Sequence, residues 1–165
     1  MRFTRALGVA AAIISLAGCD SDRLTSPNVL SYSATSRVVP NPYVNGPVPA
    51  IETVVTIRNE TSVTLSFVAG NCGVSGLKVY ASAARGTPVW SSFDKPIECS
   101  LVGYAPTPLA PGESRDVVLY ANVGDVLSGD KPAGTYQVDA VVSIGGGDIE
   151  PDILELPAGS VTLNK

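Results

Sequence analysis

Apolar side chains recur at every second position through most of the chain after residue 29. In residues 51–58, Ile51, Val55 and Ile57 fall on one face, and residues 62–69 repeat the pattern. A period of two indicates β-strands with one buried face. Bounded by clusters of Gly, Pro and other turn residues, this pattern predicts eight strands. They span residues 30–39, 51–58, 62–69, 77–82, 88–93, 115–122, 135–144 and 160–164.

Short strands at regular spacing, with no helical period between them, predict an all-β fold. The expected architecture is an antiparallel immunoglobulin-like β-sandwich of about seven to eight strands. The break at Asn59-Glu60-Thr61 predicts a hairpin turn. Prolines between residues 40 and 49 place the first strand at a sheet edge. The predicted core consists of Val55, Ile57, Val63, Leu65, Phe67, Val79, Trp90, Leu119, Tyr136, Val138, Ala140 and Val142.

Six short segments resemble the BsuPI family, which is named after an intracellular proteinase inhibitor of Bacillus. They are TIRN at 56–59, VTLSF at 63–67, LKVY at 77–80, GTPVW at 86–90, LAPGE at 109–113 and PAGTY at 132–136. The resemblance implies an immunoglobulin-like sandwich and offers proteinase inhibition as one function. An inhibitor needs a rigid extended loop, and the proline-rich segment 99–108 is the candidate.

The N-terminus reads as an export signal. Arg2 and Arg5 precede an apolar run over residues 6–15, which is too short to cross a hydrocarbon core of about 30 Å. The following Leu16-Ala17-Gly18-Cys19 resembles the lipobox of bacterial lipoproteins. This implies a signal peptide over 1–18, diacylglycerol on the Cys19 thiol, a tether over 19–28 and a domain over 29–165. The protein is expected in the bacterial cell envelope, anchored to the membrane by lipid and facing the periplasm or the cell exterior.

Lipidation of Cys19 leaves an even pair of cysteines, Cys72 and Cys99. In an oxidising compartment this pair is expected to form a disulfide. Closing a loop of about 28 residues stabilises a domain by roughly 3.5 kcal/mol in the chain-entropy model.

Charge and composition narrow the function. The chain has no histidine, so mechanisms that need an imidazole base or a histidine metal ligand are excluded. Loss of Arg2 and Arg5 with the signal peptide leaves 9 basic against 15 acidic residues, so nucleic acid is not an expected partner. We expect no cofactor, no catalytic residue and no enzymatic activity.

Two motifs offer weaker chemistry. Ser75-Gly76-Leu77-Lys78 matches the SxxK pattern of penicillin-recognising enzymes, but it enters a predicted strand, where positions i and i+3 point to opposite faces. We therefore interpret it as a loop serine and a surface lysine. Asp148, Glu150 and Asp152 alternate and are weak calcium candidates. Acidic residues also protect sheet edges from aggregation, and we prefer that interpretation.

Exposed aromatic rings can anchor protein partners or stack on sugars. Tyr80, Tyr104 and Tyr120 are predicted to point outward or to lie in loops. The expected function is a lipid-anchored, non-catalytic binding or scaffolding module with an envelope protein or peptide as its partner. A proteinase inhibitor and a carbohydrate-binding or calcium-dependent adhesion domain are the alternatives.

Overall fold

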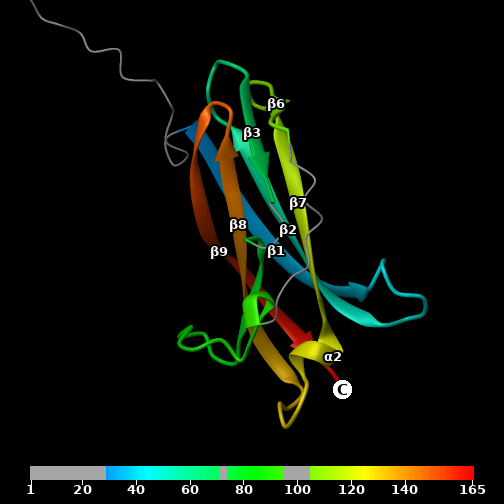
Figure 1. The fold of residues 1–165 in the computed structure, drawn as a ribbon. Coiled ribbons are helices and arrows are strands. Elements are labelled where there is room, and N and C mark those ends of the chain that lie inside the picture. The colour runs from blue at the N-terminus through cyan, green and yellow to red at the C-terminus, as the bar shows by residue number, and fades with distance from the viewer. Residues whose placement is uncertain (1–28, 71–73, 95–104) are drawn as a thin grey trace, which may run out of the picture.

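The computed structural model describes residues 29–70, 74–94 and 105–165. Two antiparallel sheets pack face to face, which confirms the predicted all-β sandwich (Figure 1). The strands are β1 (Leu30–Pro40), β2 (Pro49–Asn59), β3 (Leu65–Ala69), β4 (Gly76–Tyr80), β5 (Trp90–Ser91), β6 (Thr107–Leu109), β7 (Ser114–Asn122), β8 (Gly134–Gly146) and β9 (Ile149–Leu163). A 3-10 turn, η1 (Ser92–Asp94), and one helical turn, α2 (Val123–Val126), complete the described fold.

One sheet has the order β1-β2-β7, so β1 lies at an edge as predicted. The other sheet has the order β5-β4-β8-β3-β6, and β9 pairs with β8 over most of its length. No helix in the described ranges is long and apolar enough to cross a membrane.

The core lies between the two sheets and contains most of the predicted residues. Leu119 and Trp90 are only partly buried and pack against it. The prediction for Val63 was wrong, because this side chain is 54% exposed in the loop before β3. Tyr136, near the start of β8, donates its hydroxyl hydrogen bond to the carbonyl oxygen of Pro132 at 2.5 Å. This is the tyrosine corner that marks immunoglobulin-like sandwiches.

The predicted hairpin at Asn59-Glu60-Thr61 was also wrong. β2 and β3 belong to different sheets, so residues 60–64 cross from one layer to the other. Local turn residues permit a reversal of direction, but they do not determine whether the next strand pairs or changes sheet. The side chain of Asn59 is fully buried at this crossing.

The last strand begins earlier than predicted, at Ile149 rather than at residue 160. Gly147 has a φ of +60°, and a Cβ atom on it would stand 2.1 Å from the carbonyl oxygen of Ser66. Only glycine fits this turn between β8 and β9. Pro151 and Pro157 obscured the strand pattern, and they are tolerated because β9 pairs on one side only.

Candidate functional site

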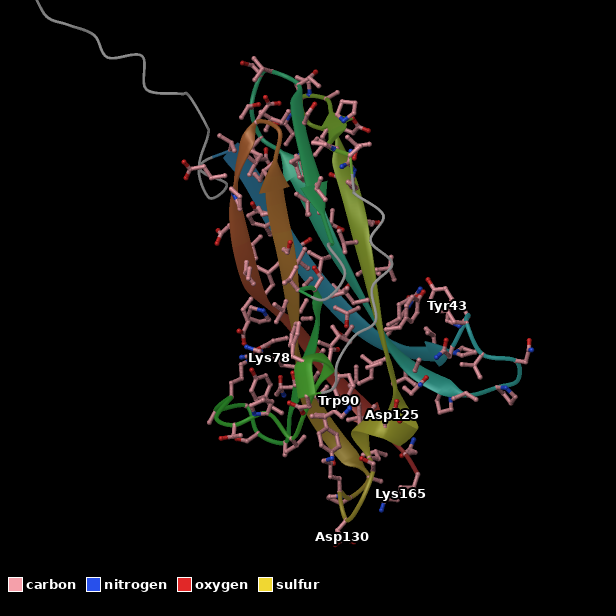
Figure 2. The ribbon with its side chains drawn as sticks, in the orientation of Figure 1. Tyr43, Lys78, Trp90, Asp125, Asp130 and Lys165 are labelled. Atoms are coloured by element: carbon pink, nitrogen blue, oxygen red, sulfur yellow. The ribbon has the colours of Figure 1, made fainter. Side chains whose placement is uncertain are left out.

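Loops gather at two opposite ends of the sandwich (Figure 1). The chain enters the fold at Leu30, which pairs with Asn59, and we call this end the entry end. The opposite, far end carries the β1–β2 loop (residues 41–48), α2 and the C-terminus. Tyr43, Trp90 and Asp125 all lie toward the far end (Figure 2).

The β1–β2 loop is held in one shape by Asn41. The backbone N–H of Asn41 donates to the carbonyl oxygen of Val48 at 2.7 Å. Its side-chain oxygen accepts a hydrogen bond from the backbone N–H of Tyr43 at 2.8 Å, and its Nδ2 donates to Oδ1 of Asn122 in β7 at 2.5 Å. The amide of Asn41 therefore fixes both the turn and its position against the sheet.

Tyr43 contacts a row of side chains on the outer face of the three-stranded sheet. The rings of Tyr43 and Tyr120 meet edge to face, with centroids 5.4 Å apart and an interplanar angle of 89°. The Tyr120 hydroxyl donates to Oε2 of Glu52 at 2.7 Å, and Nε of Arg37 donates to Oε1 at 2.6 Å. Strand register aligns these residues, because Arg37 and Tyr120 both pair with Glu52 across neighbouring strands.

The electrostatics of this row follow from those bonds. The hydrogen bonds from Tyr120 and Arg37 hold the pKa of the Glu52 carboxyl below its usual value. The same hydrogen bond to Glu52 raises the pKa of the Tyr120 phenol. Glu52 is therefore an anion at neutral pH and Tyr120 a neutral donor, so the row is a permanent support for Tyr43.

The upper layer of this site is open to solvent. Tyr43 is 81% exposed, and the side chain of Arg37 is 72% exposed while that of Glu52 beneath it is 12% exposed. Val44 and Val118 are also exposed apolar residues. We call the group Tyr43, Val44, Arg37 and Val118 the Tyr43 surface.

A second candidate is a cleft of about 260 Å³ at the far end. Trp90 forms part of its wall, and Asp94, Asp125 and Lys131 contribute charges of both signs. Asp94 accepts a hydrogen bond from the backbone N–H of Ser91 at 3.1 Å. Lys131 donates to a backbone carbonyl oxygen at 3.3 Å, so at least two of the charged groups stabilise local backbone.

Comparisons with known proteins identify no family. No protein-family model matches the chain, and no curated protein matches it. Among solved structures, a Bordetella pertussis protein assigned as ApaA aligns with a TM-score of 0.44 at 16% identity, covering 82% of this chain and 94% of that one. A Northeast Structural Genomics Consortium target aligns with a TM-score of 0.46 at 9% identity, covering 84% of this chain and 89% of that one. A β-glucosidase from Listeria innocua in complex with gluconolactone aligns with a TM-score of 0.31 at 14% identity, and the match covers 81% of this chain but only 17% of that one.

Tyr80 shares the outer face of β4 with Lys78, as predicted, but it is not exposed there. Tyr80 is buried, and its hydroxyl donates to Oε1 of Glu155 at 3.1 Å. Burial and this hydrogen bond raise the pKa of Tyr80 to about 12. Lys78 also donates to Glu155, and nearby the buried Asp139 accepts a hydrogen bond from Nε of Arg85 at 2.8 Å. Tyr80 thus belongs to a satisfied polar network, and it lies on the other sheet from Tyr120.

Ser75 and Lys78, the two polar residues of the SxxK motif, bond to different partners. Oγ of Ser75 accepts a hydrogen bond from the backbone N–H of Ser143 at 3.0 Å, whereas Lys78 forms an ion pair with Glu155. Each side chain therefore has a structural partner, and none of these bonds links the serine to the lysine.

The three acidic candidates for calcium do not converge. Asp148 lies in the β8–β9 turn, where Oδ2 accepts a hydrogen bond from the backbone N–H of Ser66 at 2.7 Å. Asp152 accepts one from the N–H of Ile153, and Glu150 is exposed. Among the described residues, no group of three or more acidic or cysteine side chains is placed to hold a metal ion.

Several predicted sites lie outside the described residues. These are Cys19, Cys72, Cys99 and Tyr104. The end of the candidate inhibitor segment is described, and its residues Thr107 and Pro108 belong to β6, paired with β3.

An apolar groove of about 540 Å³ lies on the other sheet, closer to the entry end. It is lined in part by Val74, Pro151 and Ile153, and Ile153 is 61% exposed.

Sequence reasoning missed Tyr43. The proline-rich segment around it indicated only an interruption of strand structure. The available signal was an aromatic residue between prolines, two residues after an asparagine that can order a turn.

Proposed function

We propose that this chain is a lipid-anchored, non-catalytic binding module of the bacterial cell envelope, which works through the far end of its sandwich. The lipobox-like residues ending at Cys19 support the anchor, and the oxidising compartment that follows from export supports a bridge between Cys72 and Cys99. The Tyr43 surface supports a binding role, because its residues are exposed while the row beneath them is fully engaged.

The carrying observation is that the chain enters the sandwich at the end opposite the Tyr43 surface (Figure 2). A tether over residues 19–28 spans only about 16 Å if flexible, which keeps Leu30 close to the bilayer. β1 then runs for 11 residues, or about 36 Å, away from that point. The far end therefore faces away from the membrane, where a partner can reach it.

The anchor is tested by Cys19→Ser. The variant is expected to move from the membrane fraction to the soluble fraction, because the lipid supplies the membrane affinity. A variant that stays membrane-bound would show that the anchor lies elsewhere.

The orientation is tested with fluorophores on single introduced cysteines in vesicles that contain a lipid-borne quencher. A label at Ser62→Cys, in the loop at the entry end, should be quenched strongly. A label at Asp130→Cys, at the far end in Figure 2, should keep its emission. Equal quenching at both positions, or the reverse order, would refute the orientation.

The disulfide is tested by titrating thiols in the denatured, unreduced domain with Cys19 removed. We expect no reactive thiol before reduction and two after it. Two thiols before reduction would refute the bridge. The absence of catalysis is open to a similar test, since a turnover abolished by one serine or carboxylate substitution would make this chain an enzyme.

One alternative retains a specific observation. The Tyr43 ring is exposed and held edge to face against Tyr120, and an exposed aromatic ring can stack on a sugar, so a carbohydrate ligand is a second candidate for the same surface.

A further inference from the structure

We propose that Tyr43 is the anchor by which this module recognises a second protein, and that its ring enters an apolar pocket whose rim carries a carboxylate for Arg37. This inference rests on the proposed binding function and names the kind of partner. Tyrosine and arginine are enriched among the few residues that dominate protein interfaces.

The Tyr43 surface is arranged before any partner arrives. The loop ends are stiffened by prolines at 40, 42, 47 and 49, and the backbone N–H of Tyr43 is bonded to Asn41. The edge-to-face contact with Tyr120 orients the ring, yet the side chain stays 81% exposed. Binding therefore costs little ordering of the loop, which is the advantage of a preorganised anchor.

The polar groups near Tyr43 favour a protein over a sugar. A sugar site needs donors and acceptors directed at hydroxyl groups beside the aromatic ring. Here both carboxylate oxygens of Glu52 accept hydrogen bonds, and the amides of Asn41 and Asn122 bond to each other. Val44 follows Tyr43 in the chain, and Val118 lies two residues before Tyr120 on the same face of β7; both are exposed and aliphatic, which suits an apolar pocket.

Charge indicates what surrounds that pocket. Arg37 lies above Glu52 and presents its guanidinium to solvent, whereas the carboxylate is covered. The guanidinium is ion-paired with Glu52 and is the exposed half of that pair, on a chain whose net charge is −4. A partner with a carboxylate at the pocket rim is electrostatically complementary to it.

The Ile153 groove of a second copy on the same membrane does not fit Tyr43. The apolar groove beside Ile153 is closer to the entry end, because Ile153 pairs with Ser143 near the Gly146 end of β8. Copies tethered to one bilayer stand parallel, so Tyr43 of one copy stands farther from the membrane than the groove of its neighbour.

The experiment places the photoreactive residue p-benzoylphenylalanine at position 43, or at position 153 as the control, in the full lipidated chain in whole cells. Ile153 is a matched control because it is a large, exposed apolar residue on the other sheet. We expect a protease-sensitive adduct of one defined mass from position 43 and none of that mass from position 153. Mass spectrometry then identifies the partner, which is purified for binding measurements.

With the purified partner, Tyr43→Ala is expected to weaken binding roughly 30-fold or more, as loss of a hot-spot residue does. Tyr43→Phe should bind within a few-fold of wild type, since the pocket is apolar. Arg37→Gln should weaken binding and reduce its dependence on salt. Ile153→Ala should bind as wild type does. Urea unfolding should show the same midpoint for Tyr43→Ala and wild type, because the ring is exposed.

Four results would overturn the proposal. In the cross-linking experiment, these are equal adducts from both positions, no defined protein adduct from position 43, and a position-43 adduct formed with something other than a different protein. In the binding measurement, it is partner binding that Tyr43→Ala leaves unchanged. Among adducts formed with something other than a different protein, one removed by muramidase would assign the surface to a glycan, and one of twice the chain mass would assign it to a second copy. Failure of the anchor is recognised separately, because it appears in the Cys19→Ser fractionation and not in these measurements.

Discussion

The side chain of Asn59 connects three parts of the fold and offers a direct test of the sheet crossing. It is fully buried at the end of β2. Its Nδ2 donates to the carbonyl oxygens of Val63 at 2.8 Å and Leu109 at 2.9 Å. Its Oδ1 accepts from the backbone N–H of Thr61 at 2.9 Å and from the Thr61 hydroxyl at 2.7 Å. One amide therefore fixes the crossing loop and ties it to β6.

Asn59→Ala removes all four hydrogen bonds. The groups on Thr61 and Val63 lie near the surface, where water replaces the amide at a cost of about 0.5 kcal/mol each. The carbonyl oxygen of Leu109 is buried, and leaving it without a partner costs about 1–3 kcal/mol. We expect a total loss of about 3 kcal/mol in the free energy of unfolding, which at this chain length lowers Tm by about 10 °C.

Urea unfolding followed by the fluorescence of the single tryptophan, Trp90, measures this loss. Asn164→Ala is the control, because Asn164 is exposed near the C-terminus, and its effect should stay within about 0.5 kcal/mol. A loss below about 1 kcal/mol for Asn59→Ala would refute the role given to the amide.

Asn59→Asp adds a pH dependence to the same test. The carboxylate keeps an acceptor for Thr61 but faces the carbonyl oxygens of Val63 and Leu109, so burial and repulsion raise its pKa. A raised folded pKa means that stability falls as the pH rises above the unfolded value, about 3.9. The variant should therefore be closest to wild type in acid and weakest at neutral pH. A deficit that is constant over this range would contradict the assigned contacts.

Three further predictions concern the β8–β9 turn and the polar network. In urea, Gly147→Ala should lower the free energy of unfolding by at least about 2 kcal/mol more than Gly129→Ala does. Both glycines have similar φ angles, but only a Cβ at Gly147 meets a carbonyl oxygen. Equal losses would exclude that close approach. The hydrogen bond from Lys78 lowers the pKa of Glu155, so its stabilisation is present above an unfolded pKa near 4.5 and is lost as the pH falls through the folded value. Glu155→Gln should flatten the acid decline of stability, and an unchanged decline would contradict this. Burial raises the pKa of Tyr80 to about 12. Its neutral phenol therefore stabilises the fold fully below pH 10, and this stabilisation is lost toward pH 12. In Tyr80→Phe, the ultraviolet titration should lack the last phenol to ionise.

The strands were predictable wherever one face of a segment is buried and the other is wet. β2 follows the period of two closely in its burial, and the apolar residues of β8 do so too, although Asp139 and Val141 on the other face of β8 are also buried. β6 is only three residues long, too few for alternation to separate it from a loop, and of the strand predicted over residues 88–93 only Trp90–Ser91 pairs, as β5. The first half of β9 was not predicted, because Pro151 and Pro157 interrupt the alternation of apolar and polar residues; prolines are tolerated there because β9 is an edge strand.

Pairing between elements was harder to predict than the elements themselves. Val63 has the strand period, but the chain changes sheets just before β3, where the buried amide of Asn59 holds the crossing loop. Tyr80 was assigned outward by strand parity, which was right for the face and wrong for exposure. The loop that carries Arg85, together with Glu155 of β9, contributes partners to its outer-face network, and neither contact is visible in the sequence of β4.

The candidate site was hard to predict for the same reason, because it is formed by contacts between elements. Tyr120 and Glu52 meet because β2 and β7 pair in one register, and Tyr43 joins them because Asn41 bends the loop onto that sheet. Sequence alone shows Tyr43 only as an aromatic residue among prolines. Proline stops strand pairing, so the segment contributes little to the sheet, and an 81% exposed ring contributes little to the core. A residue that contributes little to either, yet is oriented by a loop hydrogen bond, a ring contact and the ion-paired row beneath, supports the proposed binding role of the far end of the sandwich.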